Sequence, residues 1–205
     1  VYIIQDEQVA AVGENEADTT YQPNPFALNM FMLGYDNNKK LTRLNQAVKE
    51  NLQTYFGQYR MVTDAINIKN AYIINIGVQF NIMTRVGYNK HEVVLKCIRA
   101  VENYFDTDKW QIGQPIVIAE LVYKVTLVDG VAAIVTPSDA KADKSGDRPQ
   151  IIITNKFNPD NGYSGNLYDM ENAYSRGVYY PSMDPSIFEL KYPGKDIEGR
   201  AVGDL

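Results

Sequence analysis

The chain has 205 residues, of which 45% are hydrophobic and 22% charged, a composition typical of a globular protein with a core of its own. The formal net charge is −5 and no basic cluster stands out, which argues against binding to nucleic acid or to an anionic membrane surface. The single cysteine, Cys97, excludes an intramolecular disulfide and a thiolate metal cluster, and no apolar run is long enough to predict a membrane-spanning helix.

Residues 1–25 are predicted to form an acidic N-terminal segment. The segment opens with a short strand-like run over residues 1–5. It then carries acidic residues without any lysine or arginine: Asp6, Glu7, Glu14, Glu16 and Asp18. This segment accounts for the negative net charge, because acidic and basic residues balance in the remainder of the chain.

Residues 26–154 are predicted to form the main domain. The apolar run 26–33 indicates a buried strand, and after a polar turn at 34–40 the apolar spacing indicates a helix from Leu41 to a glycine stop at Gly57. A short strand is expected at 64–68. Residues 72–83 then alternate in the clearest strand pattern of the sequence. One face of this strand is apolar, and the other carries Asn75, Gln79 and Asn81. We therefore expect a central strand with helices on one side only.

The second half of this domain continues the mixture of helices and strands. Asn89 and Glu92 have the spacing of a helix capping box, and a helical apolar pattern follows. Residues 116–128 are ambiguous: β-branched residues favour a strand, but Pro115 and the Glu120–Lys124 spacing favour the helix that we predict. Strands are expected at 131–136 and 150–154, with a loop between them. The predicted fold class is α+β, a two-layer sandwich with a mixed sheet and helices on one face.

Residues 155–205 are predicted to form an extended C-terminal arm rich in tyrosine, proline and asparagine. Aromatic residues are enriched at the centres of interfaces, and prolines lower the entropy that a segment loses on docking. We predict the following partner-binding residues: Tyr179, Tyr180, Pro181, Pro185, Ile187, Phe188 and Tyr192. The alternative is that the arm folds back and completes the core of its own domain.

The search for catalytic chemistry predicts no catalytic, cofactor-binding or metal-binding residue. His91 is the only histidine and is expected at the surface, and Cys97 lies on an apolar helix stripe where a buried, inert thiol is expected. Tyr104 and Trp110 are expected in the core or in an interface. The carboxylates near element ends are interpreted as caps and turn formers: Asp106, Asp108 and Asp129. No phosphate-binding glycine motif and no nucleophile elbow is present.

Several stretches together resemble the baseplate J-like family of contractile phage tails, and in particular the C-terminal region of T4-type baseplate wedge subunits. They are LTRLNQAVKENL (41–52), YRMVTD (59–64), WQIGQPI (110–116), DGV (129–131), YPSMDPSIFELKYP (180–193) and DI (196–197). The similarity covers roughly residues 26–205. It implies a fragment of a longer protein, which agrees with the absence of an initiator methionine.

The resemblance implies a structural role in the virion and no enzymatic activity. Members of this family associate in pairs and join neighbouring wedges into a ring around the tail hub. The expected partners are a second copy of the chain, other baseplate wedge proteins and sheath-proximal proteins, in a tail baseplate assembled in the host cytoplasm. Two alternatives remain: a small-molecule-binding or enzymatic α+β domain with an unidentified pocket, and a nucleic-acid binder, which the acidic balance disfavours.

Overall fold

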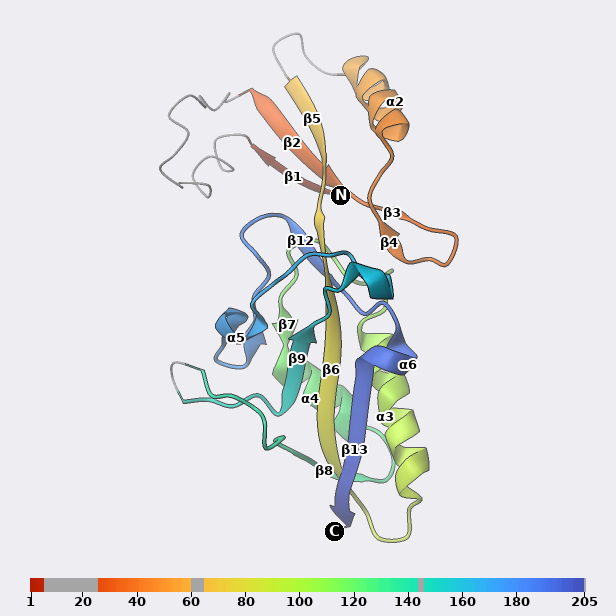
Figure 1. Cartoon of the computed structure of the whole chain (residues 1–205), viewed down its shortest axis with the longest axis vertical. Helices are drawn as coiled ribbons and strands as arrows, with labels where there is room; N and C mark the ends of the chain where they lie inside the picture. Colours follow the sequence, from red (N-terminus) through yellow and green to blue (C-terminus); the bar gives the residue numbers. More distant parts are fainter. Residues whose placement is uncertain (6–25, 60–64, 144–145, 205) are drawn as a thin grey trace. The chain divides into compact units, whose positions relative to one another are not determined.

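The computed structural model describes residues 1–5, 26–59, 65–143 and 146–204 (Figure 1). The chain divides into two compact units: Val1–Tyr72 with Met183–Ser186, and Ile73–Ser182 with Ile187–Leu205. We call them unit 1 and unit 2. Both units contain helices and paired strands, so the predicted α+β class is confirmed. The boundaries of the units differ from those of the predicted domains 1–25, 26–154 and 155–205. The predicted acidic segment after residue 5 lies outside the described residues.

Unit 1 contains a three-stranded sheet in the order β1-β2-β5, with β1 antiparallel and β5 parallel to β2. Its elements are β1 (Tyr2–Gln5), β2 (Ala27–Met32), β3 (Gly34–Tyr35), β4 (Leu41–Thr42), α2 (Gln46–Gly57) and β5 (Ala65–Asn70). The strands predicted at 1–5, 26–33 and 64–68 are thereby confirmed over their described residues. A small antiparallel hairpin of β3 and β4, followed by α2, connects the two parallel strands.

Helix α2 differs from its prediction at both ends. It begins at Gln46 and not at Leu41, because Leu41 pairs with Tyr35 in the β3–β4 hairpin and Asn45 caps the helix by accepting a hydrogen bond from the Ala47 amide. Gly57 is the last helical residue and does not adopt the left-handed conformation expected of a glycine stop. The apolar face is also less covered than expected, since no residue of α2 is buried.

Unit 2 is built around one long strand. Its elements are β6 (Tyr72–Thr84), α3 (Lys90–Tyr104), β7 (Ile116–Val117), α4 (Ile118–Thr126), β8 (Val131–Val135), β9 (Ile151–Asn155), η1 (Pro159–Asn161), α5 (Met170–Ala173), β10 (Tyr174–Ser175), β11 (Val178–Tyr179), β12 (Ser186–Glu189), α6 (Pro193–Asp196) and β13 (Ile197–Asp204). Strands β8, β9, β12 and β13 all pair with β6, and β13 is parallel to it. The predicted central strand is confirmed.

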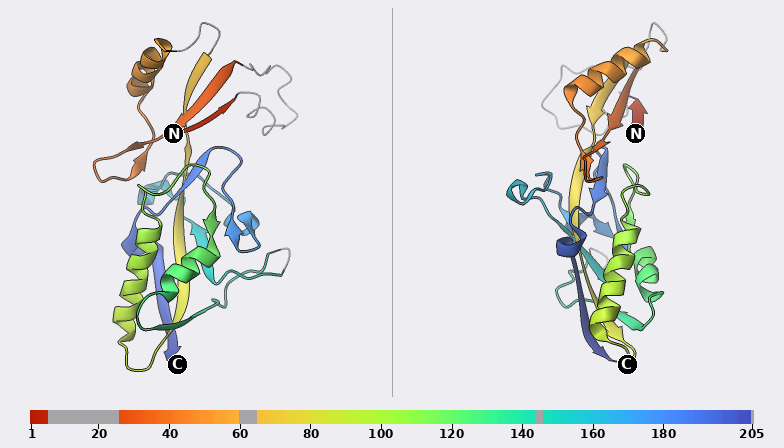
Figure 2. Two further views of the ribbon diagram at one scale, coloured as in Figure 1. Left: turned by 180° about the vertical axis from the view of Figure 1, so that it is seen from behind. Right: turned by 90° about the vertical axis from the view of Figure 1, so that its right-hand side faces the viewer.

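Helices α3 and α4 cover one face of this sheet, and Figure 2 shows η1 and α6 on the opposite side. Val93, Cys97 and Val101 of α3 are buried, and so are Ile118, Leu121 and Val125 of α4. Asn89 caps α3 as predicted, but it accepts its hydrogen bond from His91, and Glu92 forms an ion pair with Lys96 instead of closing a capping box. The ambiguous segment 116–128 is helical over 118–126, as predicted, after the two strand residues of β7.

The predicted C-terminal arm is not confirmed. Strand β13 pairs with β6 from Ile197 opposite Val78 to Asp204 opposite Thr84, and β12 also pairs with β6. Residues 155–205 therefore supply two strands of the main sheet. For these strands the alternative expectation holds, in which the segment folds back and completes the core of its own domain. The sequence pattern misled because neither strand alternates between apolar and polar residues: β12 is buried along its whole length, and β13 carries two glycines and several charged residues.

Candidate interaction surface

The predicted partner-binding residues separate into buried and exposed groups. Tyr179, Ile187 and Phe188 are buried within unit 2, and Pro185, which belongs to unit 1, is buried as well. The Tyr179 hydroxyl accepts a hydrogen bond from the Ile153 amide at 3.3 Å, and burial raises the pKa of Tyr179 to about 12. These four are core residues of the chain, which corrects their assignment to a docking surface.

Tyr180 and Tyr192 are the exposed members of the predicted set, and Pro181 is half-buried. The Tyr180 carbonyl accepts a hydrogen bond from the Tyr168 hydroxyl at 2.8 Å. This bond engages only the backbone of Tyr180, and the Tyr180 side chain is exposed. Of the predicted partner-binding residues, only Tyr180, Pro181 and Tyr192 are therefore accessible to a partner.

A buried polar network attaches the C-terminal segment to the face of β6 opposite α3 and α4. Asn75 donates to the Glu189 carboxylate at 2.8 Å and accepts from the Ser164 amide at 2.7 Å. Asn155 and Lys156 both donate to the Asn75 carbonyl. Because Asn75 is fully buried and Glu189 is 2% exposed, each of these bonds satisfies a group that water does not reach. The network is a structural anchor, and the sequence signalled it only through the polar alternation of β6.

A second buried carboxylate, Asp196, fixes the turn before β13. The Tyr163 hydroxyl and the Tyr192 amide both donate to its two oxygens. Burial, together with the hydrogen bond to this carboxylate, raises the pKa of Tyr163 well above its usual range. The Tyr192 ring packs edge-on against Tyr163 at 5.5 Å, so Tyr192 is anchored on one side while its other side remains exposed.

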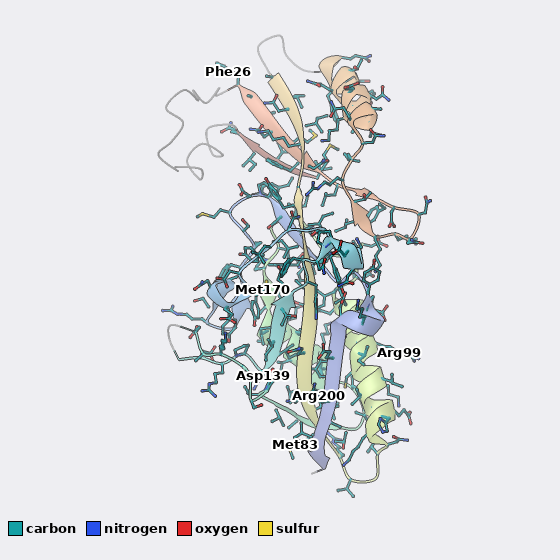
Figure 3. The ribbon with its side chains drawn as sticks, viewed as in Figure 1. Phe26, Met83, Arg99, Asp139, Met170 and Arg200 are labelled. Carbon is teal, nitrogen blue, oxygen red and sulfur yellow. The ribbon has the colours of Figure 1, made fainter. Side chains whose placement is uncertain are left out.

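A hollow of about 760 Å³ in unit 2 is lined mainly by β9, by the segment that precedes it and by α5, β10 and β11. Gln79, Ile152 and Thr154 are among its lining residues, and Asp139 and Met170, both labelled in Figure 3, come from two different segments of its wall. Its charged groups engage one another: Lys141 contacts Glu171 at 2.6 Å, and Asp143 accepts from the amides of Asp147 and Arg176. This arrangement shapes a polar recess but does not join a nucleophile to a base.

His91, Cys97 and Trp110 lie where the sequence pattern predicts them: His91 at the surface, and Cys97 and Trp110 in the core. His91 is exposed in the first turn of α3. Cys97 is fully buried, and burial raises its pKa to about 11, which keeps the thiol protonated and inert at neutral pH. Trp110 packs against Tyr104 and Phe105 at ring distances of 5.5 and 5.3 Å. In the described parts of the chain, no group of three or more potential metal ligands is assembled.

Exposed large apolar side chains are denser in unit 1 than in unit 2: half of the twenty among the described residues lie in unit 1, although it is the smaller unit. They are Val1, Tyr2, Ile3, Phe26, Tyr35, Val48, Tyr55, Tyr59, Tyr72 and Met183. The rings of Tyr55 in α2 and Tyr59 just after it pack against each other in a tilted arrangement, with centroids 5.1 Å apart. Exposed apolar residues that gather on one region mark interaction surfaces more often than scattered ones do, so unit 1 is the candidate docking region of the chain.

The comparisons with known proteins add no relative. No family model matches the sequence, and no curated protein matches it either. Within the described residues, no helix combines the length and the apolar character needed to cross a bilayer.

Proposed function

We propose that the chain is a structural subunit of a contractile phage tail baseplate wedge, which self-associates and links neighbouring wedges into a ring around the tail hub. Its role is assembly and not catalysis. The proposal takes its biological setting from the resemblance over residues 26–205. Its setting in the particle is the virion baseplate, with other wedge proteins and sheath-proximal proteins as further partners.

The observation that carries the assembly role is the concentration of exposed apolar side chains in unit 1. A protein that works alone in water seldom keeps three tyrosines and two β-branched residues exposed on one small sheet and its neighbouring helix. Tyr55 is 54% exposed and Tyr59 is 72% exposed. Tyrosines of this kind supply much of the binding energy when a partner covers them.

Labelling of whole particles tests the biological setting. Antibodies against the purified chain should bind the baseplate end of the tail in electron micrographs of the contractile-tailed particles that encode it, and the protein should be found in purified particles by mass spectrometry. Absence from the particles, with the protein present in the producing cells, would contradict the proposal.

A second candidate function is small-molecule binding, which the hollow in unit 2 favours. Its volume is in the range of roughly 300–1,000 Å³ that ligand pockets occupy. A thermal-shift screen of polar metabolites would support this function if a ligand stabilises the native chain but not an Ile152→Trp variant that fills the hollow. An Ala133→Trp variant on β8 serves as the matched control, and a screen without any stabilising ligand would remove this candidate.

A further inference from the structure

The sheet of unit 1 ends in strands that pair on one side only. Its order is β1-β2-β5, so β1 and β5 each have one neighbour among the described residues. A strand edge presents a row of peptide groups that another strand can pair with, and natural proteins usually cover or charge such edges. Neither edge strand of this sheet contains a proline, and β1 contains no charged side chain.

Strand β1 is an apolar edge. Its sequence, Tyr-Ile-Ile-Gln, consists largely of β-branched and aromatic residues with high strand propensity. Ile3 is 53% exposed and Val1, directly before the strand, is 77% exposed. An edge of this composition gains more from pairing with another strand than from water.

Strand β5 offers a groove beside its free edge. The groove has a volume of about 450 Å³. It is lined by Glu50, Gln53, Thr54 and Gly57 of α2 and by Ala65, Ile66 and Asn67 of β5. Because the Ala65 amide bonds towards β2, at the Phe26 carbonyl, the peptide groups of Ile66 and Ile68 point the other way, towards the groove. The Gln53 side chain reaches the Ile66 carbonyl only at 3.5 Å.

Helix α2 lies beyond the free edge of β5, and the three strands of the sheet bury none of its residues. Figures 1 and 2 both show α2 on the β5 side of this sheet, away from β1. Val48, Leu52, Tyr55 and Tyr59 have the 4-3-4 spacing of a helix seam, yet no residue of α2 is buried. These positions lie on the side of α2 opposite the groove-lining residues Glu50, Gln53, Thr54 and Gly57, so a fourth strand paired with β5 would contact the polar side of the helix.

We propose that β1 of a second copy of the chain pairs with the free edge of β5 and occupies the groove beneath α2. The inference deepens the proposed function, on which its biological setting rests, by naming the surfaces that join successive copies. Within one sheet β1 is antiparallel to β2 and β2 is parallel to β5, so a copy added in the same orientation places its β1 antiparallel to β5. This is the more stable of the two pairing modes.

The pairing is head-to-tail, since the two edges that meet are different. Heterologous contacts of this kind close into rings or continue as open filaments, whereas a two-fold contact stops at a dimer. Strand β1 has four residues, so the area buried is small compared with the roughly 1,200 Å² of stable specific complexes. We therefore expect weak association in isolation that grows with protein concentration.

Cross-linking between two different variants tests the pairing. One variant carries Ile3→Cys on β1 and the other carries Gly57→Cys in the groove, where an added Cβ meets no atom within 4 Å. The native Cys97 is buried and remains unreactive in both. With a bifunctional maleimide, and with one variant extended by a tag, the mixture should give the mixed cross-linked product in clear excess over links between identical variants.

The controls separate the possible contacts. A Val86→Cys variant, exposed on unit 2, should give no excess of product with Gly57→Cys. Without any cysteine substitution, Ile3→Lys in every copy of the chain should abolish concentration-dependent association, while Leu127→Lys, at an exposed position of unit 2, should leave it intact. Links mainly within the Ile3→Cys sample, or no link above the Val86→Cys level, would overturn the inference. A result of either kind leaves the labelling of particles as an independent test of the proposed function.

Discussion

Unit 1 and unit 2 bury their apolar residues to very different extents. In unit 2, the inward-facing apolar side chains of β6, α3 and α4 are almost completely buried, and two buried carboxylates, Glu189 and Asp196, are satisfied by hydrogen bonds. In unit 1, helix α2 has no buried residue and most of β1 is exposed. Unit 2 has a core of its own, whereas unit 1 keeps both an apolar helix side and two sheet edges available.

This difference indicates a division of roles within one chain. A unit with a close-packed core and hydrogen-bonded buried carboxylates holds its shape without a partner. A unit with an uncovered amphipathic helix gains stability only when another surface completes it. Substitutions in unit 2 should therefore lower the free energy of unfolding more than substitutions in unit 1. Equal losses in both units would argue against this division of roles.

The largest expected effect is the loss of a core ring in unit 2. Phe80 is buried at the centre of β6, so Phe80→Ala should lower the free energy of unfolding by about 3–5 kcal/mol. Leu52→Ala in the half-buried side of α2 should cost less than about 1 kcal/mol. Urea unfolding of both variants measures the contrast, and equal losses would contradict it.

Removal of the network residue Asn75 should have the next largest effect. Asn75→Ala takes a donor from the buried Glu189 carboxylate and an acceptor from the half-buried Ser164 amide. We expect a loss of about 2–3 kcal/mol in the free energy of unfolding. Asn67→Ala in unit 1, where the side chain makes one long contact of 3.5 Å with Asn29, is the matched control and should change little.

Alkaline pH should destabilise the chain through Cys97. The folded-state pKa is about 11 against an ordinary value of 9.0, so the unfolded chain loses its proton first as the pH rises. The stability is therefore complete below pH 9 and decreases as the pH approaches 11, by on the order of 2 kcal/mol from this group. Cys97→Ala should flatten this part of the pH profile in urea titrations. An unchanged slope in the variant would show that the thiol is not responsible.

The smallest effect on stability is expected at the exposed tyrosines of α2. Tyr55→Ser combined with Tyr59→Ser should change the free energy of unfolding by less than about 0.5 kcal/mol for each substitution. The same variant should keep its concentration-dependent self-association, because Tyr55 lies on the side of α2 opposite the groove that β1 of a second copy would occupy. If the substitutions unfold the chain instead, the rings belong to its own core.

The sequence predicted those elements whose residues repeat with a regular period. The alternation in β6 and the helical spacing in α3 are long enough to be recognised, and the ion-pair spacing of Glu120 and Lys124 correctly favoured helix α4 over a strand. The start of α2 was missed because Leu41 and Leu44 extend its apolar spacing although Leu41 pairs in a hairpin. Local spacing cannot distinguish these cases without knowledge of the β3–β4 pairing.

The role of the C-terminal quarter depended on long-range pairing and was therefore not predictable from local pattern. Its aromatic residues were interpreted as anchors for a partner, yet Tyr179 and Phe188 are buried in unit 2, and β13 pairs with a strand more than 110 residues earlier, as the Gln79–Glu198 hydrogen bond with its separation of 119 shows. The groove beside β5 likewise arises only when α2 and β5 are placed together. Polar residues such as Gln53 and Asn67 give no sign of it in the sequence.

The most direct test of the central claim is the mass of the native chain in solution as a function of concentration, measured by light scattering on a size-exclusion column. Deletion of residues 155–205 is unsuitable for this purpose, because it removes two strands that pair with β6. We predict a mass that rises above the 23.2 kDa of one chain at high micromolar concentration and returns to it in the Ile3→Lys variant. A mass of 23.2 kDa at every concentration would contradict the account of a self-assembling subunit.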